Sequence, residues 1–87
     1  MDVRMKKRAA FYTIVKLVDA NNGSLTMNTS TIKRVFNDED ETVMAELTNG
    51  TVALAYDLDF GLLDAAIIEW RDKHPKEFDN AFNNKSV

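Results

Sequence analysis

The dipeptide Asn49-Gly50 constrains the fold of this chain most strongly, because it separates two segments of strand-like composition. Asparagine followed by glycine supplies the two positive-φ positions of a type I′ turn, the tightest connection between antiparallel strands. The sequence therefore predicts a hairpin of residues 42–48 and 51–57 with positive φ at Gly50.

A two-residue loop also predicts which side chains share a face of this hairpin. Leu47 then faces Val52 and Ala45 faces Leu54, whereas Met44 lies on the opposite face. A slip of one residue would move every side chain of a strand to the other face. Since the large apolar residues other than Met44 fall together, we expect their face to be buried.

A helical period replaces the strand pattern after the hairpin. Apolar residues recur at spacings of three and four, which is typical of an amphipathic helix, on a stripe made of Phe60, Leu63, Ala66, Ile67 and Trp70. Asp57 or Asp59 is suited to cap this helix. Pro75 stops this helix or starts a new one, and the spacing of Phe78 and Phe82 is compatible with a second short helix.

Three further strands are expected before the hairpin. Residues 11–19 are rich in β-branched and aromatic types, and shorter segments follow at 24–28 and 32–36. Asn21-Asn22-Gly23 is a turn signal, and residues 28–31 indicate a turn built on hydrogen bonds from side chains to the backbone.

These elements predict the α+β class, with a small antiparallel sheet of about five strands packed against a C-terminal helix. A chain of 87 residues is long enough for one domain with one core. We interpret residues 1–9 as a basic N-terminal tail, residues 10–83 as a single α+β domain, and residues 84–87 as a frayed C-terminus.

The composition excludes several kinds of chemistry. Cysteine is absent, which excludes disulfides, thiolate catalysis and cysteine-based zinc sites. His74 is the only histidine, and we interpret it as a surface residue at a helix end. Helix capping and solubility account for Asp57, Asp59 and Glu46 without acid–base catalysis. We therefore expect no enzyme activity and no cofactor. The absence of a long apolar run predicts that the chain has no membrane span. The absence of cysteine fits a reducing compartment, and with no signal peptide evident we expect a cytoplasmic protein.

Charge is unevenly spread along a chain whose net charge is −3. Residues 1–8 carry a local +3. With Lys16, Lys33 and Arg34 as further basic residues, and with Phe11 and Tyr12 as stacking surfaces, nucleic-acid binding stays open as an alternative. The candidate partner-binding residues are a run with a local charge of −4, made of Asp38, Glu39, Asp40 and Glu41. A solvated loop is the simpler interpretation of that run.

The order of the turn and apolar motifs along the chain carries more information than any single motif. It runs through Ile14 to Leu17, Asn22-Gly23, Leu25 to Asn28, Ile32 with Val35, Glu41 to Val43, Leu47 to Gly50 and Leu63 to Trp70. From Tyr12 to Arg71 this order resembles the small flagellar protein family called FlbD or SwrD. Three parts of the chain depart from that family's pattern: the basic N-terminal tail, the extra residues in the first turn and the segment after Pro75. The resemblance implies a non-enzymatic, protein-binding role.

The sequence therefore favours a small non-catalytic protein-interaction module that binds a protein partner. One alternative is a phage or mobile-element inhibitor of a host nucleoprotein complex, similar to an anti-CRISPR protein and acting as an acidic mimic of nucleic acid. A second alternative is a nucleic-acid-binding accessory protein. The partner, the oligomeric state and the cellular or phage origin of the gene stay open.

Overall fold

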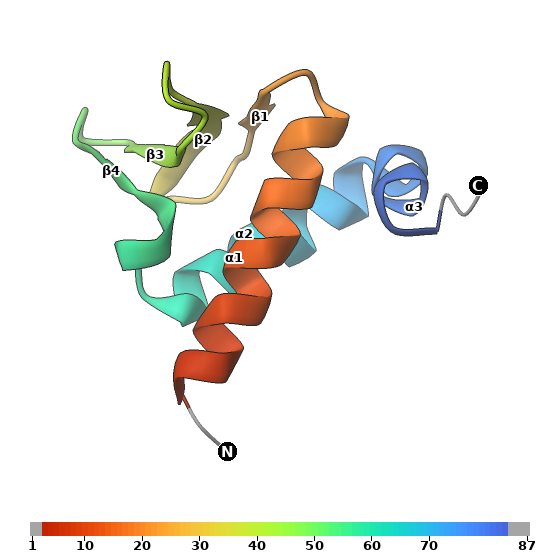
Figure 1. Ribbon diagram of the computed structural model, residues 1–87, viewed down its shortest axis with the longest axis horizontal. Helices are drawn as coiled ribbons and strands as arrows, with labels where there is room; N and C mark the ends of the chain where they lie inside the picture. The colour runs from red at the N-terminus through yellow and green to blue at the C-terminus, as the bar shows by residue number, and fades with distance from the viewer. Residues whose placement is uncertain (1–2, 84–87) are drawn as a thin grey trace.

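The computed structural model describes the backbone of residues 3–83 and the side chains of residues 7–82 (Figure 1). Its elements are α1 (Val3–Ala20), β1 (Ser24–Thr26), β2 (Ile32–Asn37), β3 (Val43–Leu47), β4 (Val52–Leu54), a 3-10 helix (Ala55–Asp57), α2 (Phe60–Lys73) and α3 (Pro75–Asn83). The four strands form one antiparallel sheet in the order β1-β2-β3-β4. The α+β class is confirmed, with a helix in place of the expected first strand.

The prediction of a strand over residues 11–19 is wrong, because this segment belongs to α1. Its apolar residues follow a helical spacing: Ala10, Ile14 and Leu17 are buried, whereas Tyr12 is exposed. Side chains three and four positions apart share a helix face, so this stripe packs into the core. The β-branched composition misled the sequence interpretation, including the strand expected at Ile14 to Leu17.

The end of α1 is set by Asn22 and Gly23, which adopt φ angles of 59° and 91°. The Gly23 N–H donates to the Val18 carbonyl at 2.8 Å and the Asn22 N–H to the Asp19 carbonyl at 3.3 Å. This is a Schellman motif, which satisfies carbonyls that the helix end leaves unpaired. The predicted turn is present, but it joins a helix to a strand.

The interpretation of residues 1–9 as a tail is wrong from Val3 onward, since α1 begins there. The predicted frayed end at residues 84–87 and the first two residues lie outside the described part of the chain.

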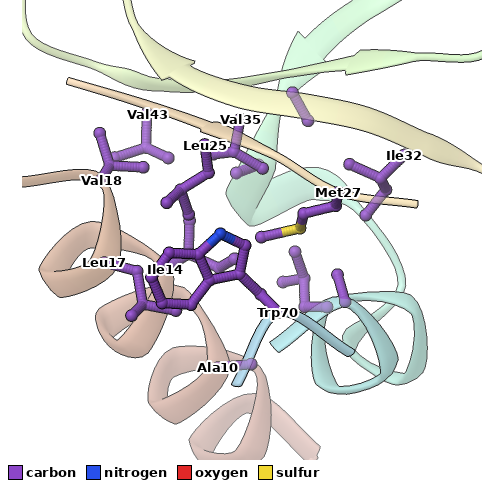
Figure 2. Close-up of a cluster of buried hydrophobic side chains, with 14 residues drawn as sticks. Ala10, Ile14, Leu17, Val18, Leu25, Met27, Ile32, Val35, Val43 and Trp70 are labelled. Carbon is purple, nitrogen blue, oxygen red and sulfur yellow. The ribbon is translucent and has the colours of Figure 1, made fainter. Parts of the chain in front are cut away.

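α1 packs against β1, β2 and β3, and α2 and α3 pack against α1 (Figure 1). The strand side chains that point away from α1 are exposed or half-buried in the described part of the chain. Figure 2 shows Trp70 of α2 between the side chains of α1 and those of β1. Trp70 is 3% exposed, which confirms it as a core residue. The other members of the buried core come from α1, the strands, the residue that follows β1, the 3-10 helix and α2: Ala10, Ile14, Leu17, Val18, Leu25, Met27, Ile32, Val35, Val43, Ala45, Ala55, Leu63 and Ala66.

The start of α2 follows the predicted cap. The Asp59 carboxylate accepts a hydrogen bond of 2.7 Å from the Gly61 N–H. A Cβ atom at Gly61 would lie 2.8 Å from Asp59 Oδ1, so glycine leaves the room that the capping carboxylate occupies. After α2 ends, Pro75 begins α3, and Phe78 and Phe82 of this second short helix pack against the core.

The hairpin of β3 and β4 has a three-residue loop instead of the predicted two-residue turn. The Leu47 N–H donates to the Thr51 carbonyl at 2.8 Å, and the Gly50 N–H donates to the Leu47 carbonyl at 2.9 Å. Gly50 has the predicted positive φ, 92°, but Asn49 does not. Such a loop combines a type I turn with one left-handed residue.

The longer loop shifts the register by one residue. Met44 pairs with Leu54, and Glu46 pairs with Val52. Since side chains alternate between the faces of a strand, Val52 and Leu54 point away from the core, and they are 49% and 42% exposed. The prediction that these two residues are buried with Ala45 is wrong.

Candidate interaction surface on the outer face of the sheet

The sheet presents an outer face, opposite to the helices, on which polar and apolar side chains stand in two cross-strand rows. The registers place Ser24, Phe36, Met44 and Leu54 in one row, and Thr26, Arg34, Glu46 and Val52 in the other. The described residues of the buried core come from the inner face and the helices. An antiparallel sheet with one solvated face normally carries polar side chains there, and this one departs from that rule.

The outer face carries an apolar patch made of Phe36, Met44, Val52 and Leu54. Phe36 and Met44 are half-buried, and Val52 and Leu54 are among the exposed large apolar residues of the described chain. Directly opposed side chains on neighbouring strands lie about 4.5–5.5 Å apart at Cβ. The patch is therefore contiguous across β2, β3 and β4.

Arg34 lies at the centre of the charged part of the outer face. Its Nε donates to Glu46 Oε1 at 2.7 Å, and its guanidinium stands 4.3 Å from the centre of the Phe36 ring. A β-bulge in β2 turns both Lys33 and Arg34 outward, and Lys33 Nζ lies 4.0 Å from Glu46 Oε2. The hydrogen bond from Arg34 holds the pKa of Glu46 below its ordinary value; partial burial opposes this effect, and the positive charges of Lys33 and Arg34 add to it.

The predicted acidic site, residues 38–41, is the loop between β2 and β3. Asp38 has a structural role in it, because its Oδ1 accepts hydrogen bonds of 2.9 Å from the N–H groups of Asp40 and Thr42. Glu41 adopts a φ of 62°, in the left-handed region that favours glycine. Glu39, Asp40 and Glu41 are exposed, so their carboxylates are accessible to a partner.

The acidic loop adjoins the apolar patch. Phe36 pairs with Met44, and two positions further along the hairpin the Asp38 N–H donates to the Thr42 carbonyl at 3.0 Å. Positions two apart on a strand share a face. The predicted acidic site therefore lies beside an apolar patch that the sequence did not predict.

Three of the acid–base candidates of the sequence have structural contacts. His74 is half-buried and stacks on Trp70 with 4.5 Å between the ring centres. Asp59 caps α2, and Glu46 pairs with Arg34. Asp57 is an exposed residue of the 3-10 helix. In the described part of the chain no three acidic or histidine side chains gather in a way that would hold a metal ion, and no helix there is long and apolar enough to cross a bilayer.

The residues considered for nucleic-acid contact are divided between two parts of the molecule. Lys33 and Arg34 lie on the outer face, whereas Lys16 lies on α1 with its Nζ 5.7 Å from the ring of the exposed Tyr12. Phe11 packs edge-on against Tyr56 with 4.9 Å between the ring centres, so its ring is engaged within the protein. The side chains of residues 1–6 lie outside the described part.

Sequence reasoning missed the apolar patch because it assigned the wrong loop length. Asn49-Gly50 suits a two-residue loop, yet glycine also suits the left-handed third position of a three-residue loop. The two readings place Val52 and Leu54 on opposite faces. A usable signal was present in Arg34 and Glu46, whose opposite charges are natural neighbours across β2 and β3.

No family model, no curated protein and no solved structure matches this chain.

Proposed function

We propose that this chain is a small, non-catalytic, cytoplasmic protein-interaction module that binds a protein partner through the outer face of its sheet. The observation that carries the proposal is the apolar patch of Phe36, Met44, Val52 and Leu54, in which Val52 and Leu54 are 49% and 42% exposed and Phe36 and Met44 are half-buried. Contiguous apolar surface on a small domain commonly marks a site of association.

The size of the patch bounds the affinity it supports. Full burial of a large apolar side chain contributes about 1.5–3 kcal/mol, and these four side chains are already partly buried. Their remaining contribution is therefore on the order of 4 kcal/mol, close to the lowest estimates of the entropic cost of association. The charged groups around the patch have to add to binding.

The acidic loop is the nearest such group. Exposed charges at the edge of an interface act mainly on the association rate and on its salt dependence. We infer that Glu39, Asp40 and Glu41 contact a basic patch of the partner, whereas Asp38 holds the loop in place. Changing Glu39 to Gln and Asp40 to Asn should slow association at low salt and leave the melting temperature nearly unchanged.

A photo-crosslinking amino acid tests the proposal in the cells that express the protein. Position 52 on the patch has a matched control at position 68 on α2, because Val52 and Ile68 are both 49% exposed. We expect a discrete protein adduct from position 52, absent from position 68 and lost in the Leu54→Asp variant. Equal adducts from both positions, or none from position 52, would contradict the proposal.

The identity of the adduct also separates this proposal from the inhibitor alternative. An adduct with a component of a nucleoprotein complex would favour an inhibitor, whereas an adduct with an unrelated protein would favour a general interaction module.

A further inference from the structure

The charges around the apolar patch are opposite at its two ends along β2. The acidic loop, with a charge of −4 over residues 38–41, follows the C-terminal end of the strand. Lys33 and Arg34 lie at its N-terminal end with Glu46, and two positive charges less one negative charge leave +1 there. Lys33 and Arg34 are 64% and 44% exposed at their side chains, so a partner can reach them.

We propose that the outer face binds the outer face of a second copy of this chain, with the strands of the two sheets running in opposite directions. This inference rests on the proposed function, since it uses the same surface and specifies the partner. A two-fold axis that lies between the faces and across the strands places the acidic loop of each copy over Lys33 and Arg34 of the other. The contact is isologous, so the charge contact between an acidic loop and the opposite Lys33 and Arg34 forms twice, once at each end of the interface.

The rest of the face is compatible with this arrangement. Two sheets pack face to face about 10 Å apart, with their side chains interdigitating. The row of Phe36, Met44 and Leu54 lies between the two charged ends, so these side chains of both copies meet in the middle of the interface. The Arg34 guanidinium has five N–H donors, and its hydrogen bond to Glu46 uses Nε.

Each copy has an overall charge of −3, which opposes association. In the antiparallel arrangement, however, the two acidic loops stand about one strand length apart, roughly 18 Å for residues spaced by about 3.3 Å. This exceeds the Debye length of about 8 Å at physiological ionic strength. The local attraction between each loop and the opposite Lys33 therefore outweighs the screened repulsion.

The area of the face predicts a weak dimer. Four strands about 4.8 Å apart, with five or six residues in the central two, span on the order of 300–400 Å². A stable interface usually buries about 800 Å² on each partner. We therefore expect fast exchange and a dissociation constant on the order of 10–1,000 μM.

Analytical ultracentrifugation of the purified chain from about 5 μM to 1 mM at physiological salt tests the inference. We expect a reversible monomer–dimer equilibrium. Leu54→Asp should weaken it at least tenfold, and Ile68→Asp, which changes a similarly exposed apolar residue on α2, should not. Circular dichroism identifies variants that do not fold; Leu54→Thr, which keeps a strand-forming residue, replaces Leu54→Asp if that variant unfolds.

A charge exchange tests the antiparallel orientation. One variant carries Glu39→Lys, Asp40→Lys and Glu41→Lys, which changes the charge of residues 38–41 from −4 to +2, and the other carries Lys33→Glu. Each variant alone places like charges opposite each other in the dimer and should associate at least tenfold more weakly than the wild type. An equal mixture should recover association, because the reversed loop of one copy then meets Glu at position 33 of the other.

A wild-type chain that stays monomeric to 1 mM, or a mixture that does not recover, overturns the inference. The proposed function fails separately: a monomeric chain that still forms an adduct with another protein from position 52 refutes the dimer alone. Adducts between two copies of this chain support both.

Discussion

Glu41 and Gly50 occupy the same position in two loops of the same design. In each loop the left-handed residue donates its N–H three positions back, to the Asp38 carbonyl at 3.0 Å or the Leu47 carbonyl at 2.9 Å. Glycine adopts this conformation freely, whereas a residue with a Cβ loses about 1–2 kcal/mol. The β2–β3 loop thus carries strain that the β3–β4 loop does not.

Glu41→Gly should raise the free energy of unfolding by about 1 kcal/mol, because it removes that strain. Gly50→Ala should lower it by about 1–2 kcal/mol, and purely through the backbone, since no atom lies within 4 Å of a Cβ placed there. Urea denaturation measures both. Glu39→Gly is the matched control: Glu39 has no positive φ, so the added freedom of glycine should reduce stability.

Trp70→Ala should lower the free energy of unfolding by about 3–5 kcal/mol, because it removes a large side chain from the centre of the core. His74→Ala should cost less, about 0.5–1.5 kcal/mol, since it removes only the ring that stacks on Trp70. Equal losses of unfolding free energy from the two variants would contradict the conclusion that Trp70 contributes more to the core than His74 does.

At the scale of elements, the sequence was informative where the spacing of its apolar residues fitted only one kind of secondary structure. The stripe from Phe60 to Trp70 predicted α2, and Asp59 predicted its cap. The sequence was ambiguous where one motif is compatible with two structures. Asn22-Gly23 closes a helix as well as it turns a hairpin, and Asn49-Gly50 fits loops of two lengths. Tertiary packing decides such cases, and it made residues 11–19 helical despite their strand-like composition.

The ion pairs that join β2 to β3 predict a dependence of stability on pH. The folded-state pKa of Glu46 is lowered, mainly by Arg34. Glu46 therefore stabilises the fold above the unfolded-state pKa of about 4.3, and this contribution is lost as the pH falls through the lower folded-state value. The melting temperature of Glu46→Gln should lie below that of the wild type at pH 7, and the gap should close toward pH 3. A gap of constant size would show that Glu46 acts without its charge.

At the scale of the whole molecule, α1 covers one face of the four-stranded sheet, and α2 and α3 pack on α1 (Figure 1). The described side chains of the other face stay exposed or half-buried. The sequence predicted the acidic loop at the edge of this face. It did not predict the apolar patch beside it, because the face of Val52 and Leu54 depends on a single residue of loop length. The proposed interaction surface therefore depends on the register between β3 and β4.

Nuclear Overhauser effects between Hα protons measure that register directly in dilute solution. Pairs without mutual hydrogen bonds bring their Cα atoms to about 4.5 Å, which makes their Hα contacts strong. The structure predicts strong contacts between Met44 and Leu54 and between Glu46 and Val52. Contacts between Leu47 and Val52 and between Ala45 and Leu54 would instead indicate a two-residue loop, place Val52 and Leu54 in the core, and contradict the interaction surface.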